Sequence, residues 1–205
     1  MNNFWNKFIY NIGASFYDKF FNSGVFLKAR KEIFKDFHLD ERLKILFVGV
    51  GTGADIELIN YAYHNITAID YSPNMLEKAQ VKFQNSNIQF LEMDAQNMTF
   101  DNESFDLIIA SLILSVVPDA SMCFKEMERV LNQHGTIVVF DKFAPTNKKL
   151  ALPKILLRPF ISLLGTDIGR SFEEIIAQKS NNIKVVQDEP VMLNGMYRKI
   201  VLSKV

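Results

Sequence analysis

The amino-acid sequence predicts an α/β fold in which helices cover both faces of a mostly parallel sheet. From about residue 44 onward, apolar runs of strand length alternate with amphipathic stretches of helix length, which is the rhythm of β-α-β units. Near the C-terminus, two strand-like runs at 183–190 and 196–205 are separated only by residues 191–195. So short a link implies an antiparallel pair.

The elements follow from these patterns in order. Helix 73–85 has a proline at its first turn and apolar residues on one face, and strand 135–141 contains three β-branched residues in a row. Residues 1–43 are rich in aromatic side chains and are predicted to form a helical cap. The predicted elements are strands at 44–50, 65–70, 88–92, 105–110 and 135–141, helices at 54–61, 73–85, 121–131 and 172–179, and the final pair of strands.

Composition excludes several classes of protein. The 205 residues are 48% hydrophobic, which predicts one globular domain with a sizeable core. Equal numbers of basic and acidic residues, 23 of each, give no basic excess for a nucleic-acid partner. The single cysteine, Cys123, and three scattered histidines offer neither a disulfide nor a metal site. Without a secretory signal or a membrane-spanning stretch, a cytoplasmic location is expected.

A glycine-rich turn marks a ligand site. Gly49, Gly51 and Gly53 follow a strand and precede a helical stretch, where a ligand can approach the backbone closely. Asp70 follows Gly49 by 21 residues and ends the second strand, so that it can accept hydrogen bonds from ribose hydroxyls. Asp94 after the third strand could accept from an adenine amine. Nicotinamide dinucleotides also fit this turn, and Asp70 and Asp94 could instead be a helix cap and a loop residue.

Five motifs in residues 41–141 together resemble the class I S-adenosylmethionine-dependent methyltransferases of the type 11 group. That resemblance implies a Rossmann-like, doubly wound, seven-stranded sheet with a C-terminal antiparallel hairpin, and S-adenosylmethionine as cofactor. The motifs are the glycine turn at 45–53, an acidic residue followed by S-x-x-M-L at 70–76, Met-Asp-Ala at 93–95, the strand 105–111, and the helix 125–131 followed by Gly135.

The resemblance also implies residue roles. The glycines would hold the methionine part of the cofactor, Asp70 the ribose, Asp94 the adenine amine, and Ser111 the methyl-transfer side. Tyr17 matches a tyrosine in the N-terminal lid of quinone and lipid methyltransferases, although it could equally pack a helix against the sheet. The predicted cofactor-binding residues are Tyr17, Gly49, Gly51, Thr52, Gly53, Asp70, Tyr71, Met75, Asp94, Ala95 and Ser111.

Two residues depart from the family pattern. Phe47 stands where an acidic residue is usual on the first strand, and Ser115 stands where many small-molecule members carry histidine. No catalytic residue is therefore assigned. Methyl transfer from a sulfonium is an in-line displacement that needs positioning more than a base, so an amine or a thiol fits better than an alcohol.

Residues 142–170 combine basic side chains with an apolar stretch, a pattern typical of segments that lie in a membrane interface. The segment more loosely resembles bacterial phospholipid N-methyltransferases, although it could instead be a packed lid with solvated lysines and arginines. The predicted single domain, 1–205, thus consists of the cap 1–43, a cofactor-binding core 44–141, this segment 142–171, and the helix and hairpin 172–205.

The predicted function is methyl transfer to a small-molecule or lipid acceptor with a nitrogen, sulfur or quinone nucleophile. Peripheral association with the inner membrane surface through 142–170 is part of this hypothesis. Two alternatives stay open at this point, a nicotinamide-dependent oxidoreductase and a protein that binds S-adenosylmethionine without catalysis. Binding of the two kinds of cofactor would distinguish the first alternative, and turnover the second.

Overall fold

The computed structural model describes residues 23–35, 41–144, 169–177 and 181–205. Most of the predicted N-terminal cap, including Tyr17, and most of segment 142–171 lie outside the described residues. Within them, the first element is helix α2, Gly24–Phe34.

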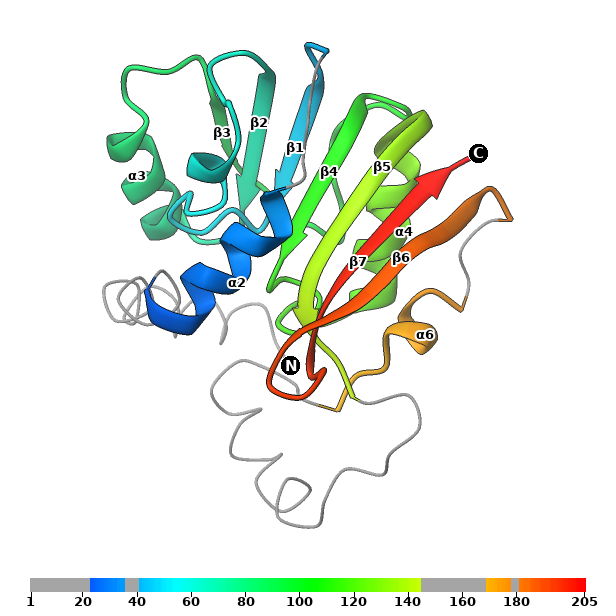
Figure 1. The fold of residues 1–205 in the computed structure, drawn as a ribbon. Coiled ribbons are helices and arrows are strands. Elements are labelled where there is room, and N and C mark those ends of the chain that lie inside the picture. The colour runs from blue at the N-terminus through cyan, green and yellow to red at the C-terminus, as the bar shows by residue number, and fades with distance from the viewer. Residues whose placement is uncertain (1–22, 36–40, 145–168, 178–180) are drawn as a thin grey trace.

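In the described part of the chain, seven strands form one sheet in the order β3-β2-β1-β4-β5-β7-β6 (Figure 1). Strands β1 to β5 are parallel, whereas β7 is antiparallel to both β5 and β6. The predicted doubly wound sheet with a C-terminal antiparallel hairpin is therefore confirmed. The strands are β1 Lys44–Val48, β2 Asn65–Asp70, β3 Gln89–Glu92, β4 Phe105–Ser111, β5 Leu131–Lys142, β6 Ile183–Met192 and β7 Tyr197–Lys204.

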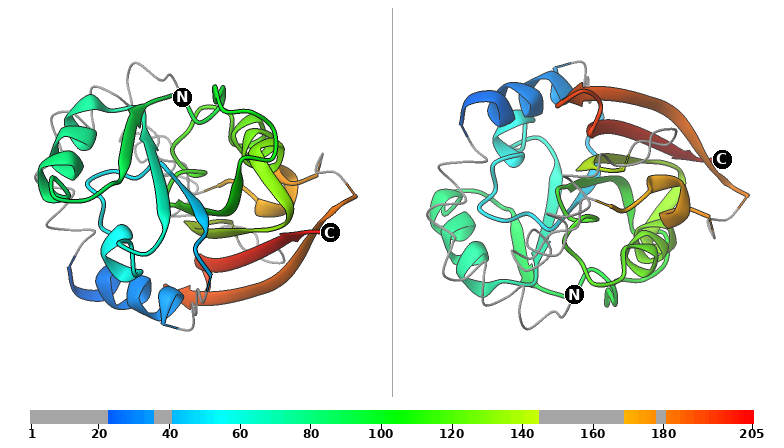
Figure 2. Two further views of the ribbon diagram at one scale, coloured as in Figure 1. Left: turned by 90° about the horizontal axis from the view of Figure 1, so that it is seen from above. Right: turned by 90° about the horizontal axis from the view of Figure 1, so that it is seen from below.

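Helices cover both faces of this sheet (Figure 2). Helix α2 packs Ala29, Ile33 and Phe34 into the apolar layer on one face, and buried residues of helix α4, Ala120–Val130, fill the layer on the other. Continuous apolar strands such as β1 and β4 bury side chains in both layers, as expected of parallel strands. The remaining elements are the short 3₁₀ helix η1 Ile56–Leu58, helix α3 Pro73–Lys82 and helix α6 Phe172–Ile175.

Helix α4 shows why these sequences form helices where they do. The Asp119 carboxylate accepts a hydrogen bond from Met122 N at 2.9 Å and caps the first turn. Its buried residues recur at helical spacing, and Cys123 among them is fully buried. This burial raises the pKa of the Cys123 thiol, which packs as a small apolar residue of the core.

One predicted helix is wrong. The stretch 54–61 forms only the three-residue turn η1, and Ile59 is already extended. Asp55, at the position that would cap a helix, makes no capping bond and instead pairs with Arg30 of α2. Without a cap the short amphipathic pattern is too weak to hold a helix, because most helical stability comes from tertiary packing. Helix α6 is likewise shorter than predicted and ends at Ile175.

The parallel strands place several connecting loops at one edge of the sheet. Strands β1, β2, β3, β4 and β5 run in the same direction, so their carboxyl ends meet at the lower edge of the sheet in Figure 1. In doubly wound sheets this carboxyl edge is where ligands bind. The glycine turn, Asp70, Asp94 and Ser111 lie at or just beyond the ends of these strands.

Candidate functional site

The glycine turn joins β1 to η1 at the carboxyl edge, and each of its three glycines has a positive φ, between 56° and 81°. They serve different purposes. A Cβ on Gly49 would lie 2.6 Å from Ile113 Cδ1, and one on Gly53 would lie 2.6 Å from Phe83 Cε2. At Gly51 no atom of the described residues lies within 4 Å of the Cβ position. Gly51 is therefore the glycine that leaves open space beside the backbone, which is the space a ligand needs.

Asp70 lies beside this turn, where the sequence predicts it. Its carboxylate accepts from Gly51 N and from Ser72 N, both at 2.8 Å. Desolvation by burial raises the pKa of Asp70, while these backbone N–H groups favour the ionised form and act against that rise. The N-cap of α3 is Ser72, whose side chain accepts from Met75 N, so the alternative that Asp70 caps this helix is wrong.

The third motif lies next to Asp70. Met93 N donates to Asp70 O at 3.0 Å, which places Asp94 immediately beyond the neighbouring strand. The Asp94 carboxylate accepts from the backbone N and the side-chain Nε2 of Gln96, both at 2.9 Å. Asp94 thus has its orientation fixed by a neighbour, and Ala95 beside it is buried.

Tyr71 and Met75, both among the predicted cofactor-binding residues, differ in exposure. Tyr71 is 39% exposed and presents a large aromatic surface at the carboxyl edge, whereas Met75 is 2% exposed. A ligand contact by Met75 would require that side chain to become more exposed. Thr52 in the glycine turn is also buried, and Ser111 at the end of β4 is half-buried.

The two departures from the family pattern are both buried. Phe47 is 2% exposed and packs in the apolar layer beneath α2, so an apolar side chain fills the usual place of an acidic one. Ser115 is 1% exposed. Its backbone N donates a hydrogen bond to the Asp141 carboxylate at 3.0 Å, and its hydroxyl group is hydrogen-bonded to the same carboxylate. Ser115 therefore faces the interior, and it is not a base at the carboxyl edge.

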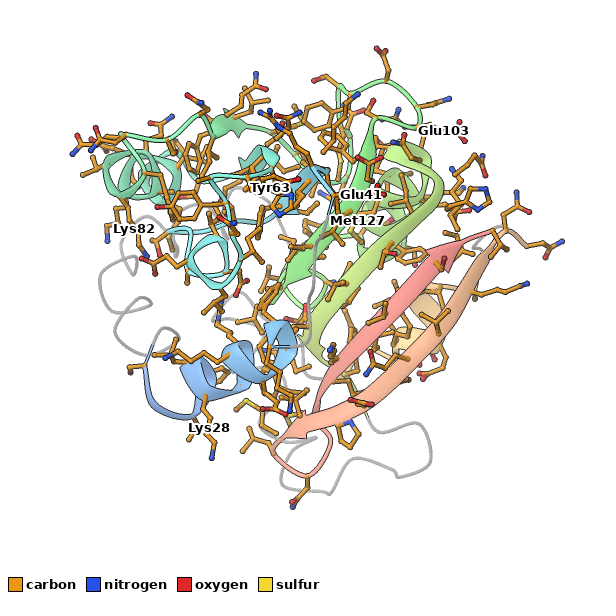
Figure 3. The ribbon with its side chains drawn as sticks, turned by 45° about the horizontal axis from the view of Figure 1, so that its top comes forward. Lys28, Glu41, Tyr63, Lys82, Glu103 and Met127 are labelled. Carbon is orange, nitrogen blue, oxygen red and sulfur yellow. The ribbon has the colours of Figure 1, made fainter. Side chains whose placement is uncertain are left out.

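Two features of the site give no signal in the sequence. Asp141, at the end of β5, is fully buried, and desolvation raises the pKa of its carboxyl group. Arg30 of α2 pairs with Asp55 at 2.5 Å, and both side chains are buried. Lys28, two residues earlier in the same helix, instead points away from the sheet (Figure 3). Only the fold brings Arg30 and Asp55 together, because no spacing rule links residues so far apart.

The described residues fit an adenosine cofactor and contain no group of three histidine, cysteine or acidic side chains that could hold a metal ion. Gly51 leaves room for the cofactor next to the backbone. The Asp70 carboxylate lies within hydrogen-bonding distance of the same turn, and it can accept from the two ribose hydroxyls. These features define a nucleoside-binding α/β protein.

Comparisons with known proteins give the family. Residues 46–139 match the methyltransferase domain family. A phosphatidylethanolamine N-methyltransferase of Cereibacter sphaeroides is 30% identical over 158 residues, which cover 75% of this chain and 76% of that protein. A demethylmenaquinone methyltransferase of Staphylococcus haemolyticus is 36% identical over 121 residues, but the match covers only 51% of its length.

Solved structures agree with the fold. An S-adenosylmethionine-dependent methyltransferase of Thermotoga maritima, described as a possible histamine N-methyltransferase, has a TM-score of 0.70 at 19% identity and covers 97% of this chain and 99% of its own. The [4+2]-cyclase SpnF also has a TM-score of 0.70, at 15% identity, with 86% and 80% covered. A fold that includes a cyclase does not by itself show methyl transfer.

The domain match and the relatives show the family, which the fold by itself does not show. The chain belongs to the S-adenosylmethionine-dependent methyltransferase family, and S-adenosylmethionine is its cofactor. It is thus a methyltransferase and not a nicotinamide-dependent oxidoreductase, the alternative that the glycine turn alone left open.

Proposed function

We propose that this chain transfers the methyl group of S-adenosylmethionine to the amine of a phospholipid headgroup, of the phosphatidylethanolamine type. One observation carries the proposal. At the place where other members carry a basic histidine, Ser115 is buried and bonded to the buried Asp141. A neutral amine already has a free lone pair, so its attack on the methyl group requires no base in the transition state. The relative that spans three quarters of both chains acts, by its name, on such an amine.

The predicted residues would bind and orient the cofactor. We expect the methionine part to lie along the three glycines of the turn, the ribose hydroxyls on Asp70, and the adenine beside Tyr71 and Met75 with its amine on Asp94. The cofactor supplies an activated methyl group on a positively charged sulfur. The task of the chain is to hold the acceptor nitrogen in line with that methyl near Ser111 and to exclude water.

Access to a lipid acceptor implies contact with a membrane surface. None of the described helices is both long and apolar enough to cross a bilayer. The basic and apolar segment 142–170 is the proposed contact, at the cytoplasmic face of the inner membrane, although residues 145–168 lie outside the described part of the chain. Its lysines and arginines would be attracted to anionic lipid.

The deciding experiment measures product by mass. The full chain is incubated with S-adenosylmethionine and one of three acceptors: phosphatidylethanolamine in mixed micelles, demethylmenaquinol in the same micelles, or a small aliphatic thiol. We expect methylated phosphatidylethanolamine to be the main product. Asp70→Ala serves as the control for cofactor-dependent turnover. Methylation of the quinol or the thiol without methylation of the lipid would overturn the proposed acceptor, while leaving the family assignment intact.

A further inference from the structure

The loop after β4, residues 112–118, begins in an unusual conformation. Leu112 has a φ of +55°, which is rare for a residue other than glycine, and its side chain is buried. Such a backbone conformation is strained and persists only where the surroundings hold it. Leu112 N donates to Phe140 O of β5 at 2.7 Å and makes the first of these restraining contacts.

This loop lies directly against the cofactor turn. The Ile113 side chain occupies the space that a Cβ on Gly49 would need, at 2.6 Å. The loop also continues into α4 at Asp119, whose N donates to Gln96 Oε1 at 2.8 Å. Gln96 Nε2 in turn donates to Asp94. Two routes, one by packing and one by hydrogen bonds, therefore connect the loop to predicted cofactor-binding residues.

Arg170 holds the middle and the end of this loop. Its Nη1 donates to Leu114 O at 2.6 Å, and its Nη2 donates to Pro118 O at 3.1 Å. The backbone of Arg170 is itself fixed at the end of β5, because Ala144 N donates to Arg170 O at 2.8 Å. A planar guanidinium suits this task, since its forked donors reach two carbonyl groups at once.

We propose that Arg170 is a positioning residue of the methyl-transfer site. Arg170 keeps residues 112–118 packed against Gly49 and keeps Asp119 within hydrogen-bonding distance of Gln96. It thereby sets the shape of the cofactor site without touching the cofactor itself. The contact crosses more than 50 residues of sequence and joins the segment before α6 to the loop after β4. The inference requires the cofactor site described above and is independent of which acceptor the enzyme methylates.

The test compares Arg170 with a second cation that also donates to two carbonyl groups. Lys204 of β7 donates to Leu131 O at 2.8 Å and to Glu128 O at 3.4 Å. It also pairs with Glu103, which lies at the opposite edge of the sheet from the cofactor turn (Figure 3). Lys204→Met is therefore the control for Arg170→Met.

The readout is the Kd of S-adenosylhomocysteine, measured by calorimetry with the full chain. We expect Arg170→Met to raise this Kd about fivefold to tenfold and Arg170→Lys, which keeps the positive charge and can reach one of the two carbonyl groups, to raise it less. Lys204→Met is expected to lower the melting temperature without changing the Kd by more than about twofold. If the Arg170 variants bind like the parent, or if the Lys204 variant loses as much affinity, the positioning role is wrong.

Hydrogen exchange supplies a second readout that does not depend on Arg170→Met being fully stable. In the conservative Arg170→Lys variant, amide exchange in residues 112–118 is expected to accelerate, and bound S-adenosylhomocysteine is expected to slow it again. The control Lys204→Arg should leave exchange in this loop unchanged. Parent-like exchange of the loop in Arg170→Lys would show that other contacts hold it, and would overturn the proposal.

Discussion

Asp70 links the glycine turn to the start of α3 in the proposed cofactor site. It ends β2, and it accepts hydrogen bonds both from the glycine turn and from the residue that caps α3. The same carboxylate thus shapes the turn before any ligand binds and offers acceptors to a ribose. Its replacement should therefore affect cofactor binding and, to a smaller degree, the order of the turn.

Replacement of Asp70 by alanine should weaken binding of S-adenosylmethionine by roughly 1.5–3 kcal/mol, the scale for losing hydrogen bonds to a charged group. Asp70→Asn keeps one carbonyl oxygen for the backbone donors and should lose less affinity. Calorimetry of both variants is the measurement, with a melting curve as control. Unchanged affinity in folded Asp70→Ala would show that the ribose lies elsewhere.

At Gly51 a side chain would enter open space and not the protein core. The φ of +56° disfavours most side chains, but asparagine tolerates this region better than others. We therefore expect Gly51→Asn to lose cofactor binding while its free energy of unfolding falls by only about 1 kcal/mol. Urea denaturation without ligand checks the second part. A collapse of stability would instead assign this glycine to the turn.

Asp141 should make the stability of the protein depend on pH in a defined direction. Because burial raises the pKa of this carboxyl group, the folded chain holds its proton at pH values where the unfolded chain, near its usual 3.8, has lost it. Stability from this group is therefore greatest at low pH and falls as pH rises above about 4. The Asp141→Asn variant should gain stability relative to the parent between pH 4 and pH 7, measured by urea denaturation. A constant difference across that range would contradict the shift.

At the scale of elements, the buried pair of Arg30 and Asp55 fastens helix α2 to the connection after the glycine turn. Arg30 is 5% exposed and Asp55 is 7% exposed, so neither charge is well solvated. The same helix also packs apolar side chains on the sheet, and Phe26 contacts Tyr197 edge to face with ring centroids 5.4 Å apart. The apolar contacts attach α2 to the sheet, and the buried ion pair joins it to the connection after the glycine turn.

Removal of one partner from this pair should cost far more than removal of both. Arg30→Met leaves the Asp55 charge buried without its partner and should lower the free energy of unfolding by about 3–5 kcal/mol. The double variant Arg30→Met with Asp55→Leu should recover most of that loss, because apolar side chains of similar size can fill the space. Denaturation of the single and the double variant gives the free energy of unfolding that each has lost. Equal losses in the two variants would show that the charges of Arg30 and Asp55 are only weakly coupled.

At the scale of the whole molecule, the proposed lipid acceptor implies that the protein binds anionic vesicles. The four basic residues Lys148, Lys149, Lys154 and Arg158 each contribute on the order of 1 kcal/mol near a charged surface, and salt screens that attraction. Their combined replacement by glutamine should reduce sedimentation with anionic vesicles and leave the Kd for S-adenosylmethionine unchanged. Equal and negligible binding of the parent to neutral and anionic vesicles would remove the membrane hypothesis.

The sequence predicts the sheet well because its signals are local. Apolar runs of strand length, glycines with required positive φ, and Pro73 at a helix start all act within a few residues. The stretch 54–61 is the informative failure. Its amphipathic pattern indicates a helix, but Asp55 is taken by Arg30 and cannot act as the cap. Tertiary contact overrides local preference there.

The sequence alone determined the order of the elements, the glycine turn with Asp70 after the next strand, and the family to which these motifs belong. The tertiary structure decided which glycine faces open space and that Ser115 turns inward to Asp141. It also decided that Arg30 pairs with Asp55 and that Arg170 holds the loop after β4. The physical reason is the separation in sequence over which each interaction acts. Backbone preferences and periodicity act over one or two turns of chain, whereas burial and ion pairing depend on neighbours that only the folded chain brings together.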